Sequence, residues 1–302
     1  MARRGATDLS GVLLIDKPSG MTSHDVVSVV RGVTGESRVG HAGTLDPMAQ
    51  GLLIVLVGPA TRLAPYLSAA SKRYRARFVF GTATDTDDAE GAVVRTQDIP
   101  DTLADPAFAA RAVEALIGTH SQVPPDYSAI KQGGRTAYKA ARGGKALELA
   151  AREIEISSAG LIGVGGEPLS WDVELEVSKG TYIRAIARDL GMQLGTAAHL
   201  GALRRTSAGV VSVEQAHTLD EIRAHDPAGI PELFVPALRV LGLPVVELDD
   251  AHVALVRDGH PLPEPQVHGG PVAVAHQGRL LAIYEHRHGA LRPQTVFPGG
   301  VL

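Results

Sequence analysis

Residues 171–177 alternate between apolar and acidic side chains, and no other segment constrains the fold as strongly. In an extended chain, one face would carry four apolar side chains and the other three carboxylates: Trp171, Val173, Leu175 and Val177 against Asp172, Glu174 and Glu176. Successive side chains of a strand point to opposite faces of its sheet. A strand with one face in solvent is typical of antiparallel sheets. The segment therefore predicts a half-solvated antiparallel strand.

Further strands and helices are interspersed without a regular alternation. The apolar runs 12–15 and 52–57 predict strands buried on both faces, and residues 74–80 predict a strand with Arg75 and Arg77 outward. Helices are expected from an N-cap at Ser23, from Asp105-Pro106 to Gly118, and from 183 to Gly195. This order favours an α+β fold, with a largely antiparallel mixed sheet and flanking helices, over a doubly wound sheet.

The pattern of the sequence changes at about residue 244. Short strand-like runs follow at 272–274 and 280–284, separated by turns rich in proline and glycine. Such spacing is typical of small β structures. We therefore expect a small all-β domain at the C-terminal end.

Composition excludes several classes of protein. Lys and Arg number 29 against 33 Asp and Glu, a net charge of −4, which excludes a uniformly basic nucleic-acid-binding coat. The chain has 0 Cys, which removes disulfides and thiolate chemistry and fits the reducing cytoplasm. No apolar run approaches the ~20 residues of a membrane span, and the N-terminus does not resemble a signal peptide. We expect a soluble, cytoplasmic protein without membrane contact.

The charge is unevenly distributed along the chain. Residues 62–77, 131–148 and 179–205 are rich in Lys and Arg and hold very few carboxylates. If these stretches converge in space, they form a local basic surface that suits a phosphate backbone. Scattered, solvated side chains are the alternative.

Common cofactor and metal signatures are absent from the sequence. Neither the P-loop motif nor the dinucleotide-binding glycine motif occurs. The cluster Asp85, Asp87, Asp88 and Glu90 lacks the spacing of a calcium loop, so a solvated turn is the favoured interpretation. The tail contains six histidines, interpreted as solvated loop residues rather than metal ligands. His252, His260, His268 and His276 are spread over separate turns, and His286 and His288 are too close in sequence for ligation from one helix face.

Residues 38–51 form the most unusual stretch, with three glycines, a histidine and an Asp-Pro pair directly before a buried strand. Glycine-rich loops allow close approach to another molecule. Pro47 pushes Asp46 toward an extended backbone. From these residues alone, Asp46 is either a turn-forming carboxylate or a chemically active one.

Five motifs together resemble those of bacterial tRNA pseudouridine-55 synthases, the TruB-type family. They are Gly11-Val-Leu-Leu-Ile-Asp-Lys-Pro-Ser-Gly-Met-Thr-Ser23, Gly40-His-Ala-Gly-Thr-Leu-Asp-Pro47, Lys72-Arg-Tyr-Arg75, Thr84-Asp-Thr-Asp87 and Ser178-Lys-Gly-Thr-Tyr-Ile-Arg184. They occur in the family's order over residues 9–220, with further matches at 127–131 and 203–205. One departure is Gln50, where the family usually has Thr.

The resemblance implies a cofactor-free, metal-free isomerisation of uridine 55 in the T-loop of tRNA. Asp46 matches the catalytic aspartate, whose carboxylate attacks C1′ or C6 of the flipped-out nucleotide. These two routes, and a glycal-type one, stay open. Arg184 matches the arginine that pairs with this aspartate and keeps it ionised. Tyr74 matches the tyrosine that stacks on the target base.

Three further residues match the substrate pocket of the family. His41 matches a histidine that occupies the space of the flipped nucleotide, and Tyr182 and Leu203 match other pocket residues. Without the resemblance, Tyr74, Tyr182 and Leu203 would be interpreted as packing residues. Lys17 and Pro18 are interpreted as structural supports of the catalytic loop.

The resemblance also implies a domain organisation and a partner. Residues 9–240 correspond to the catalytic domain, with a basic insertion at about 123–149 that grips the T-arm, and residues 245–302 to a PUA-like β-domain. The partner is tRNA, bound through its T-arm and, through the C-terminal domain, its acceptor stem. The alternative function is a non-enzymatic RNA binder or tRNA-folding chaperone. A synthase acting on another uridine is a second alternative.

Overall fold

The structure is a computed structural model that describes residues 7–128, 130–132, 134–145, 147–262, 270–287 and 289–302. The chain divides into two compact units. Unit 1 consists of Met1–Ala70 and Ser207–Leu302, and unit 2 of Ser71–Thr206.

Unit 1 contains the first predicted strands. β1 (Gly11–Lys17) lies between β3 (Gln50–Val57) and β14 (His217–Thr218), and β2 (Val39–Ala42) pairs with the second half of β3, from Val57 back to Ile54. β1 runs antiparallel to β3 and parallel to β14, so the sheet is mixed. The apolar runs of β1 and β3 are almost completely buried, which confirms the interpretation of 12–15 and 52–57.

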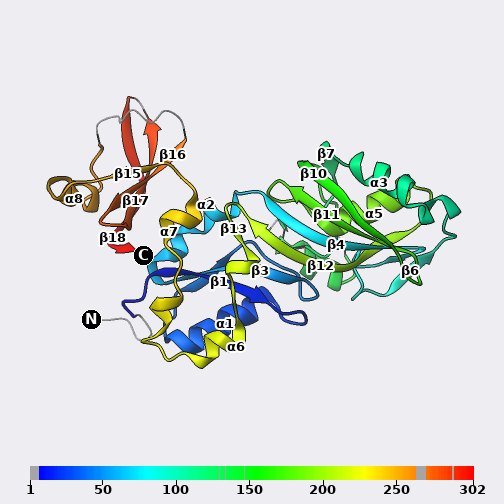
Figure 1. Cartoon of the computed structure of the whole chain (residues 1–302), viewed down its shortest axis with the longest axis horizontal. Helices are drawn as coiled ribbons and strands as arrows, with labels where there is room; N and C mark the ends of the chain where they lie inside the picture. Colours follow the sequence, from blue (N-terminus) through cyan, green and yellow to red (C-terminus); the bar gives the residue numbers. More distant parts are fainter. Residues whose placement is uncertain (1–6, 129, 133, 146, 263–269, 288) are drawn as a thin grey trace. The chain divides into compact units, whose positions relative to one another are not determined.

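Helix α1 (Ser23–Thr34) follows β1 (Figure 1). The predicted N-cap at Ser23 is wrong by one residue. Thr22 is the cap, and it forms a reciprocal capping box with Asp25. The Ser23 hydroxyl does not cap the helix, and it donates instead to the carbonyl oxygen of Leu45 at 3.0 Å. The helix buries Val26, Val27 and Val30, as their spacing predicts.

Short elements complete the part of unit 1 outside its C-terminal sheet. They are η1 (Gly58–Leu63), α2 (Ala64–Ser68), β13 (Val211–Ser212), η3 (Val213–Gln215), α6 (Leu219–Ala224), η4 (Ile230–Leu233) and α7 (Ala237–Leu241). The chain end is tied to this part, because the amide of Ala237 donates to the carbonyl oxygen of Leu302 at 2.7 Å.

The C-terminal segment forms a four-stranded sheet in the order β15 (Val245–Glu247), β16 (Pro271–His276), β17 (Arg279–Arg287) and β18 (Ala290–Val301) (Figure 1). The expectation of an all-β domain is wrong in one respect, since α8 (Asp250–Arg257) lies between β15 and β16. Asp249 caps this helix, which buries Val253 and Val256. One apolar core joins this sheet to β1 and β3.

The sheet of unit 2 has the order β12 (Ala198–Ala208), β4 (Lys72–Phe80), β11 (Ser170–Val177), β10 (Arg152–Gly165) and β7 (Gly118–Gln122). β11 is antiparallel to both neighbours and alternates between buried and solvated residues, which confirms the first sequence prediction. On its solvated face, Arg77 of β4 forms a bidentate ion pair with Asp172 of β11 at 2.8 and 2.9 Å.

The other elements of unit 2 flank this sheet. They are β5 (Thr82–Thr84), β6 (Val93–Thr96), η2 (Asp101–Ala104), α3 (Pro106–Glu114) and α5 (Ile183–Gln193). Asp105 caps α3 as predicted, but the helix ends before Gly118. Gly118 instead begins β7, where it pairs with Ile156 of β10. Gly118 is therefore a strand residue, because it pairs with β10, although its place after α3 resembles that of a helix C-cap.

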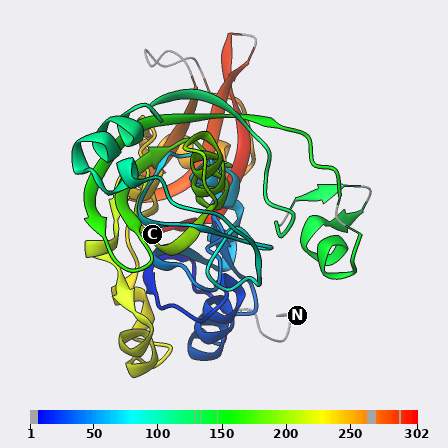
Figure 2. The same cartoon turned by 90° about the vertical axis from the view of Figure 1, so that its right-hand side faces the viewer.

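The insertion, residues 123–149, contains a two-stranded hairpin of β8 (Lys131–Gln132) and β9 (Arg135–Thr136), followed by α4 (Ala137–Arg142). Figure 2 shows this segment in green, set apart from the sheet of its unit. Tyr127 and Tyr138 pack edge to face with centroids 5.8 Å apart. This contact links the base of the insertion to α4.

No group of three or more His, Cys, Asp or Glu side chains in the described parts of the chain is placed to hold a metal ion. No helix in those parts of the chain is long and apolar enough to cross a membrane. His268 and His288 of the tail lie outside the described residues.

Two glycines should respond in opposite ways to replacement by alanine. A Cβ on Gly11 would overlap the ring of Phe234, whereas a Cβ on Gly32 of α1 would meet no atom within 4 Å. We expect Gly11→Ala to lower the free energy of unfolding by about 1–3 kcal/mol through overpacking. Gly32→Ala should raise it by about 0.5–1 kcal/mol, because alanine favours the helix. Urea unfolding measures both, and a loss of stability in Gly32→Ala would contradict this packing.

Candidate active site

The loop at residues 43–49, here called the Asp46 loop, joins β2 to β3 in unit 1. Asp46 is half-buried, and Leu45 and Ala49 are fully buried. The amide of Ala49 donates to the carbonyl oxygen of Asp46 at 3.1 Å, which closes a tight turn. Gly43 has a φ of 90°, a left-handed value that glycine adopts without strain.

Both neighbours of Asp46 are fastened to the segment that ends β1 and begins α1. The amide of Leu45 donates to the Ser23 hydroxyl at 2.9 Å, and this hydroxyl donates back to the Leu45 carbonyl. On the other side, the carbonyl oxygen of Pro47 accepts from the amide of Gly20 at 2.9 Å. The backbone on each side of Asp46 is thereby held, which limits how far its carboxylate can move.

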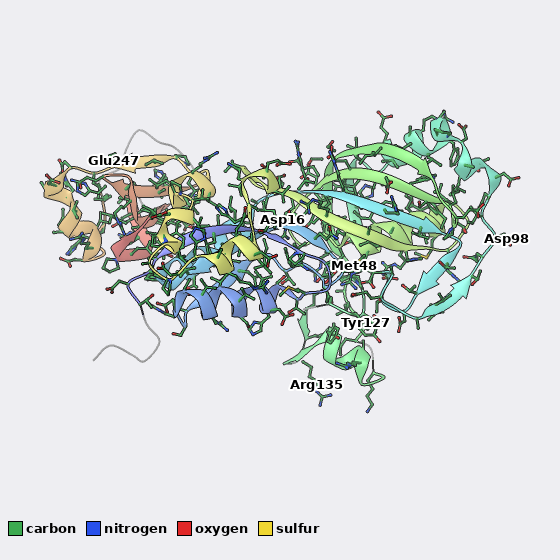
Figure 3. All side chains as sticks on the ribbon, turned by 60° about the horizontal axis from the view of Figure 1, so that its bottom comes forward. Asp16, Met48, Asp98, Tyr127, Arg135 and Glu247 are labelled. Atoms are coloured by element: carbon green, nitrogen blue, oxygen red, sulfur yellow. The ribbon has the colours of Figure 1, made fainter. Side chains whose placement is uncertain are left out.

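Lys17 supplies a third tie. Its side chain is fully buried, and its ammonium donates to the carbonyl oxygens of Pro18, Met21 and Pro47 at 2.9, 2.6 and 3.2 Å. A buried cation is tolerated only where its hydrogen-bonding capacity is met. Lys17 therefore joins the end of β1 to the Asp46 loop, which confirms its interpretation as a structural support. Figure 3 labels Asp16, next to Lys17, and Met48 in the loop.

His41 also lies in unit 1, on β2. It is partly buried and pairs in register with Val55 of β3. The Asp46 loop begins two residues later.

Tyr74 lies in unit 2, on the buried face of β4. It retains 8% of its exposure and shares this face with Ala76, Phe78 and Phe80. Its partner in β11 is Leu175. The alternation that the sequence predicts for residues 74–80 is therefore present, and Tyr74 is the polar aromatic residue nearest the start of the strand.

Lys72 stands two residues before Tyr74 on the same face of β4, and it too is buried. Burial lowers the pKa of Lys72 to about 8, and the nearby cations Arg205 and Lys179 lower it further. The sequence analysis did not select this residue for a role. Lys72 belongs to the basic stretch 62–77, and its two cationic neighbours belong to the basic stretch 179–205. These two stretches therefore approach each other within unit 2, as the sequence predicts.

Arg184, in the first turn of α5, is held by backbone oxygens. It retains 4% of its exposure, and it donates to the carbonyl oxygens of Thr86 and Tyr127 at 2.8 and 3.0 Å. Asp88 lies 3.5 Å from the same guanidinium. Arg184 thus connects the helix to two segments that are far away in sequence, which fixes the plane of its guanidinium.

The turn at residues 84–90 is not the solvated turn that we expected. Asp88 is buried and accepts hydrogen bonds from the Thr86 hydroxyl and the Glu90 amide at 2.6 and 3.1 Å. Asp87 forms an ion pair with Arg188 at 2.9 Å. Burial raises the pKa of Asp87, and Arg188 opposes that change. The expectation failed because both cationic partners lie about a hundred residues away, on α5.

Tyr182 and Leu203 also belong to unit 2. Tyr182 caps α5 without a side-chain bond, and its backbone exchanges two hydrogen bonds with the buried side chain of Gln122, at 2.9 and 3.1 Å. Leu203 is buried on β12 and shares that side of the strand with Arg205. The guanidinium of Arg152 lies 5.9 Å from the centre of the Tyr182 ring.

The root of the insertion is fastened to α5. Arg188 donates to the carbonyl oxygen of Val123 at 2.8 Å, and Arg184 to that of Tyr127. Farther out, Arg135, Arg142 and Lys145 are exposed. Figure 3 labels Tyr127 near the root and Arg135 toward the outer part.

The structure thus divides the six predicted site residues between the units. Tyr74, Tyr182, Arg184 and Leu203 belong to unit 2, and His41 and Asp46 to unit 1. The meeting of Asp46 with Tyr74 and Arg184 stays a prediction. The sequence analysis missed the ties made by Ser23 and Gln122, because each stands among other polar residues and no local pattern distinguishes it.

Two family models match the chain. The model for the N-terminal domain of TruB family pseudouridylate synthases matches residues 31–183, and the model for the C-terminal domain of tRNA pseudouridylate synthase B matches residues 184–239. The chain belongs to the TruB family of pseudouridylate synthases. The family resemblance seen in the motifs is thereby confirmed, and the enzyme is an isomerase.

Known relatives are similar in sequence to this chain over almost its whole length. A protein named tRNA pseudouridine synthase B from Thermobifida fusca is 44% identical over 96% of this chain and 99% of its own length. Proteins of the same name from Mycobacteroides abscessus and Mycobacterium tuberculosis are 43% and 40% identical, over 91% and 96% of the chain. A purely RNA-binding role without catalysis, the first alternative, therefore has no support.

Solved structures share the fold. A Cbf5–Nop10–Gar1 complex matches with a TM-score of 0.70 and 25% identity, over 95% of this chain and 84% of the other. An archaeal box H/ACA sRNP Nop10–Cbf5 complex matches with a TM-score of 0.68 and 22% identity, over 95% and 85%. These similarities confirm the predicted α+β fold with a small C-terminal β-rich domain.

The buried Lys72 predicts a pH dependence of stability. Below pH 8 its ammonium is charged in both the folded and the unfolded protein. Between pH 8 and its ordinary value of 10.5, the folded form has lost this proton and the unfolded form has not. Its contribution to the free energy of unfolding therefore rises with pH in that window, by at most about 1.4 kcal/mol per unit.

We expect Lys72→Met to remove this rise. The stability of the variant relative to the wild type should fall by roughly 2 kcal/mol between pH 7 and pH 9.5. Urea unfolding at both pH values measures the difference. Lys145→Met, which removes an exposed lysine of the same unit, is the control. Identical pH profiles for Lys72→Met and the wild type would contradict the shift.

Proposed function

We propose that this enzyme converts uridine 55 in the T-loop of tRNA to pseudouridine, with Asp46 as the nucleophile. The observation that carries the proposal is the immobilised Asp46 loop, in which Leu45 and Pro47 are both fastened by hydrogen bonds. Family membership supplies the reaction class, and the names of the relatives supply the substrate class. A cytoplasmic location and tRNA as the partner are parts of the same proposal.

The reaction conserves the atoms of the nucleotide. The N1–C1′ bond breaks, the detached uracil turns, and a C5–C1′ bond forms. The proton on C5 leaves and N1 gains one, so substrate and product are isomers. The carboxylate of Asp46 attacks C1′ or C6 of an everted nucleotide, and carboxylates perform comparable chemistry at sugar carbons in glycosidases.

Arg184 and Tyr74 are proposed to act beside Asp46. A guanidinium whose orientation is fixed by two carbonyl oxygens can bind a carboxylate without losing further freedom. Tyr74 offers a ring for stacking on the everted base, worth about 1–3 kcal/mol. We assign His41, Tyr182 and Leu203 to the walls of the substrate pocket.

We also propose the domain limits and contacts that the sequence suggests. Residues 9–240 form the catalytic domain and 245–302 the PUA-like domain. The insertion at 123–149 binds the T-arm through its exposed cations, and the C-terminal domain reaches the acceptor stem. The exposed Arg135, Arg142 and Lys145 support the first of these contacts.

Asp46→Asn tests the nucleophile. Turnover on an unmodified T-arm hairpin should fall by about 10⁴-fold or more, as it does when other enzymes lose their nucleophile. Affinity for the hairpin should change little, because the amide has nearly the shape of the carboxylate. Nucleoside analysis and filter binding measure the two quantities. Asp101→Asn, at an exposed carboxylate of η2, is the control. Wild-type turnover in Asp46→Asn would refute the assignment.

The double variant Arg142→Gln, Lys145→Gln tests the insertion. We expect about tenfold weaker binding of the T-arm hairpin, and a slope of log K against log salt that is shallower by about 2. The control is Arg95→Gln, Arg111→Gln, which removes the same charge from exposed positions of unit 2. Equal losses in both double variants would mean that only net charge matters, contrary to the proposed contact.

A further inference from the structure

A pocket of about 360 Å³ lies in unit 1, where η1 meets the end of β18. Its size falls within the range of about 300–1,000 Å³ that is typical of small-molecule sites. The lining residues that matter here are Arg38, Thr61, Arg62, Phe297, Gly299 and Gly300. We call this the arginine pocket.

The arginine pocket is far from the Asp46 loop. The loop precedes β3, whereas η1 follows it, so the two lie at opposite ends of an eight-residue strand. At about 3.3 Å per residue, this separates them by about 23 Å. The pocket therefore belongs to a site other than the proposed catalytic one.

Its position depends on contacts between distant segments. The amide of Gly58 donates to the carbonyl oxygen of Arg38 at 2.7 Å, which joins η1 to the start of β2. Tyr66 and Thr295 share a hydrogen bond at 3.2 Å between their hydroxyls, and Phe297 is buried in the core that β18 shares with β3. The walls of the pocket are thus firmly supported.

Arg62 presents a charged, planar group to this pocket. Its guanidinium carbon lies 4.7 Å from the centre of the Phe297 ring, so the aromatic ring supports it from one side. Arg62 is exposed, and within the described parts of the chain no carboxylate forms an ion pair with it. Its charge is therefore offered to solvent or to a ligand.

Arg38 adds a second guanidinium, with half of its side chain exposed. Its ion pair with the buried Glu36 uses Nε, at 3.3 Å, so the two terminal nitrogens take no part in that bond. Glu36 is largely occupied by the amides of Thr7 and Arg38, at 2.7 and 2.8 Å. Both arginines thus retain donors for an anion.

On the β18 side, backbone without side chains lines the arginine pocket, at Gly299 and Gly300. Gly300 has a φ of 71°, and a Cβ there would approach Nε of Arg279 to 3.0 Å, so a side chain at this position would be strained. A Cβ on Gly299 would meet nothing within 4 Å, which leaves that stretch of backbone open to a ligand. Arg279 donates to the Gly299 carbonyl at 3.4 Å and brings a third cation behind this wall.

We propose that the arginine pocket binds one nucleotide of the tRNA, outside the T-arm. Guanidinium groups bind phosphate through paired hydrogen bonds, and their planes accept stacked bases. The phosphate lies between Arg38 and Arg62, and the base lies on the face of Arg62 that Phe297 does not cover. The distance of about 23 Å along β3 places this nucleotide well away from the target uridine. The proposal rests on tRNA being the substrate.

Arg62→Gln and Arg38→Gln test the pocket, with Arg292→Gln as the control. Arg292 is an exposed arginine of β18 outside the pocket. We expect each pocket variant to bind full-length unmodified tRNA about tenfold more weakly, and to lower the salt slope by about 1. Arg62→Lys, which keeps the charge but loses the planar fork, should fall between wild type and Arg62→Gln.

A T-arm hairpin identifies the part of the tRNA involved. Filter binding measures the affinity of each pocket variant for both RNAs. The fold-loss of affinity should be at least five times larger for full-length tRNA than for the hairpin. Equal losses for the two RNAs, an equal effect of Arg292→Gln, or unchanged tRNA affinity in both pocket variants would each overturn the proposal. Turnover of the hairpin by the wild type tests the proposed function separately, so the two failures are distinguishable.

Discussion

The hydrogen bonds that hold the backbone on both sides of Asp46 are the constraint on which the site in unit 1 depends. A buried ammonium, a buried hydroxyl and one amide, from Lys17, Ser23 and Gly20, all bind the Asp46 loop. Each comes from the end of β1 or the start of α1. A strand buried on both faces is therefore coupled directly to the loop, and a carboxylate on such a loop starts its reaction close to the required geometry.

In unit 2, hydrogen bonds to the backbone hold a cation in place in the same way. The guanidinium of Arg184 is held by two carbonyl oxygens and lies beside the buried Asp88. One turn farther along α5, Arg188 holds Asp87 and the root of the insertion. The helix therefore connects the 84–90 turn, the proposed catalytic arginine and the proposed RNA-binding segment. Charged hydrogen bonds of this kind are stronger than neutral ones, which suits a site that must keep its shape while RNA binds.

A chain with a net charge of −4 can still bind RNA if its cations gather locally. Lys72 with Arg205 and Lys179, and Arg38 with Arg62, are two such gatherings that the fold builds from separate segments. In contrast, the arginines of β4 are balanced across the sheet, as Arg77 is by Asp172. The number of arginines is therefore a poor guide to an RNA-binding surface, and the presence of nearby carboxylates is a better one.

The sequence by itself determined strands β1, β3, β4, β11, β16 and β17, helices α1, α3 and α5, and the family. Apolar periodicity follows from which faces are buried, and a cap such as Asp105 before Pro106 is a pattern of adjacent residues, so both can be read locally. Only the tertiary structure decided the roles of Ser23, Arg184 and Gly118. Their hydrogen-bond or strand partners lie between 22 and 98 residues away, as with Ser23 to Leu45 and Arg184 to Thr86. No local pattern records such a partner, because it becomes a neighbour only when the chain folds.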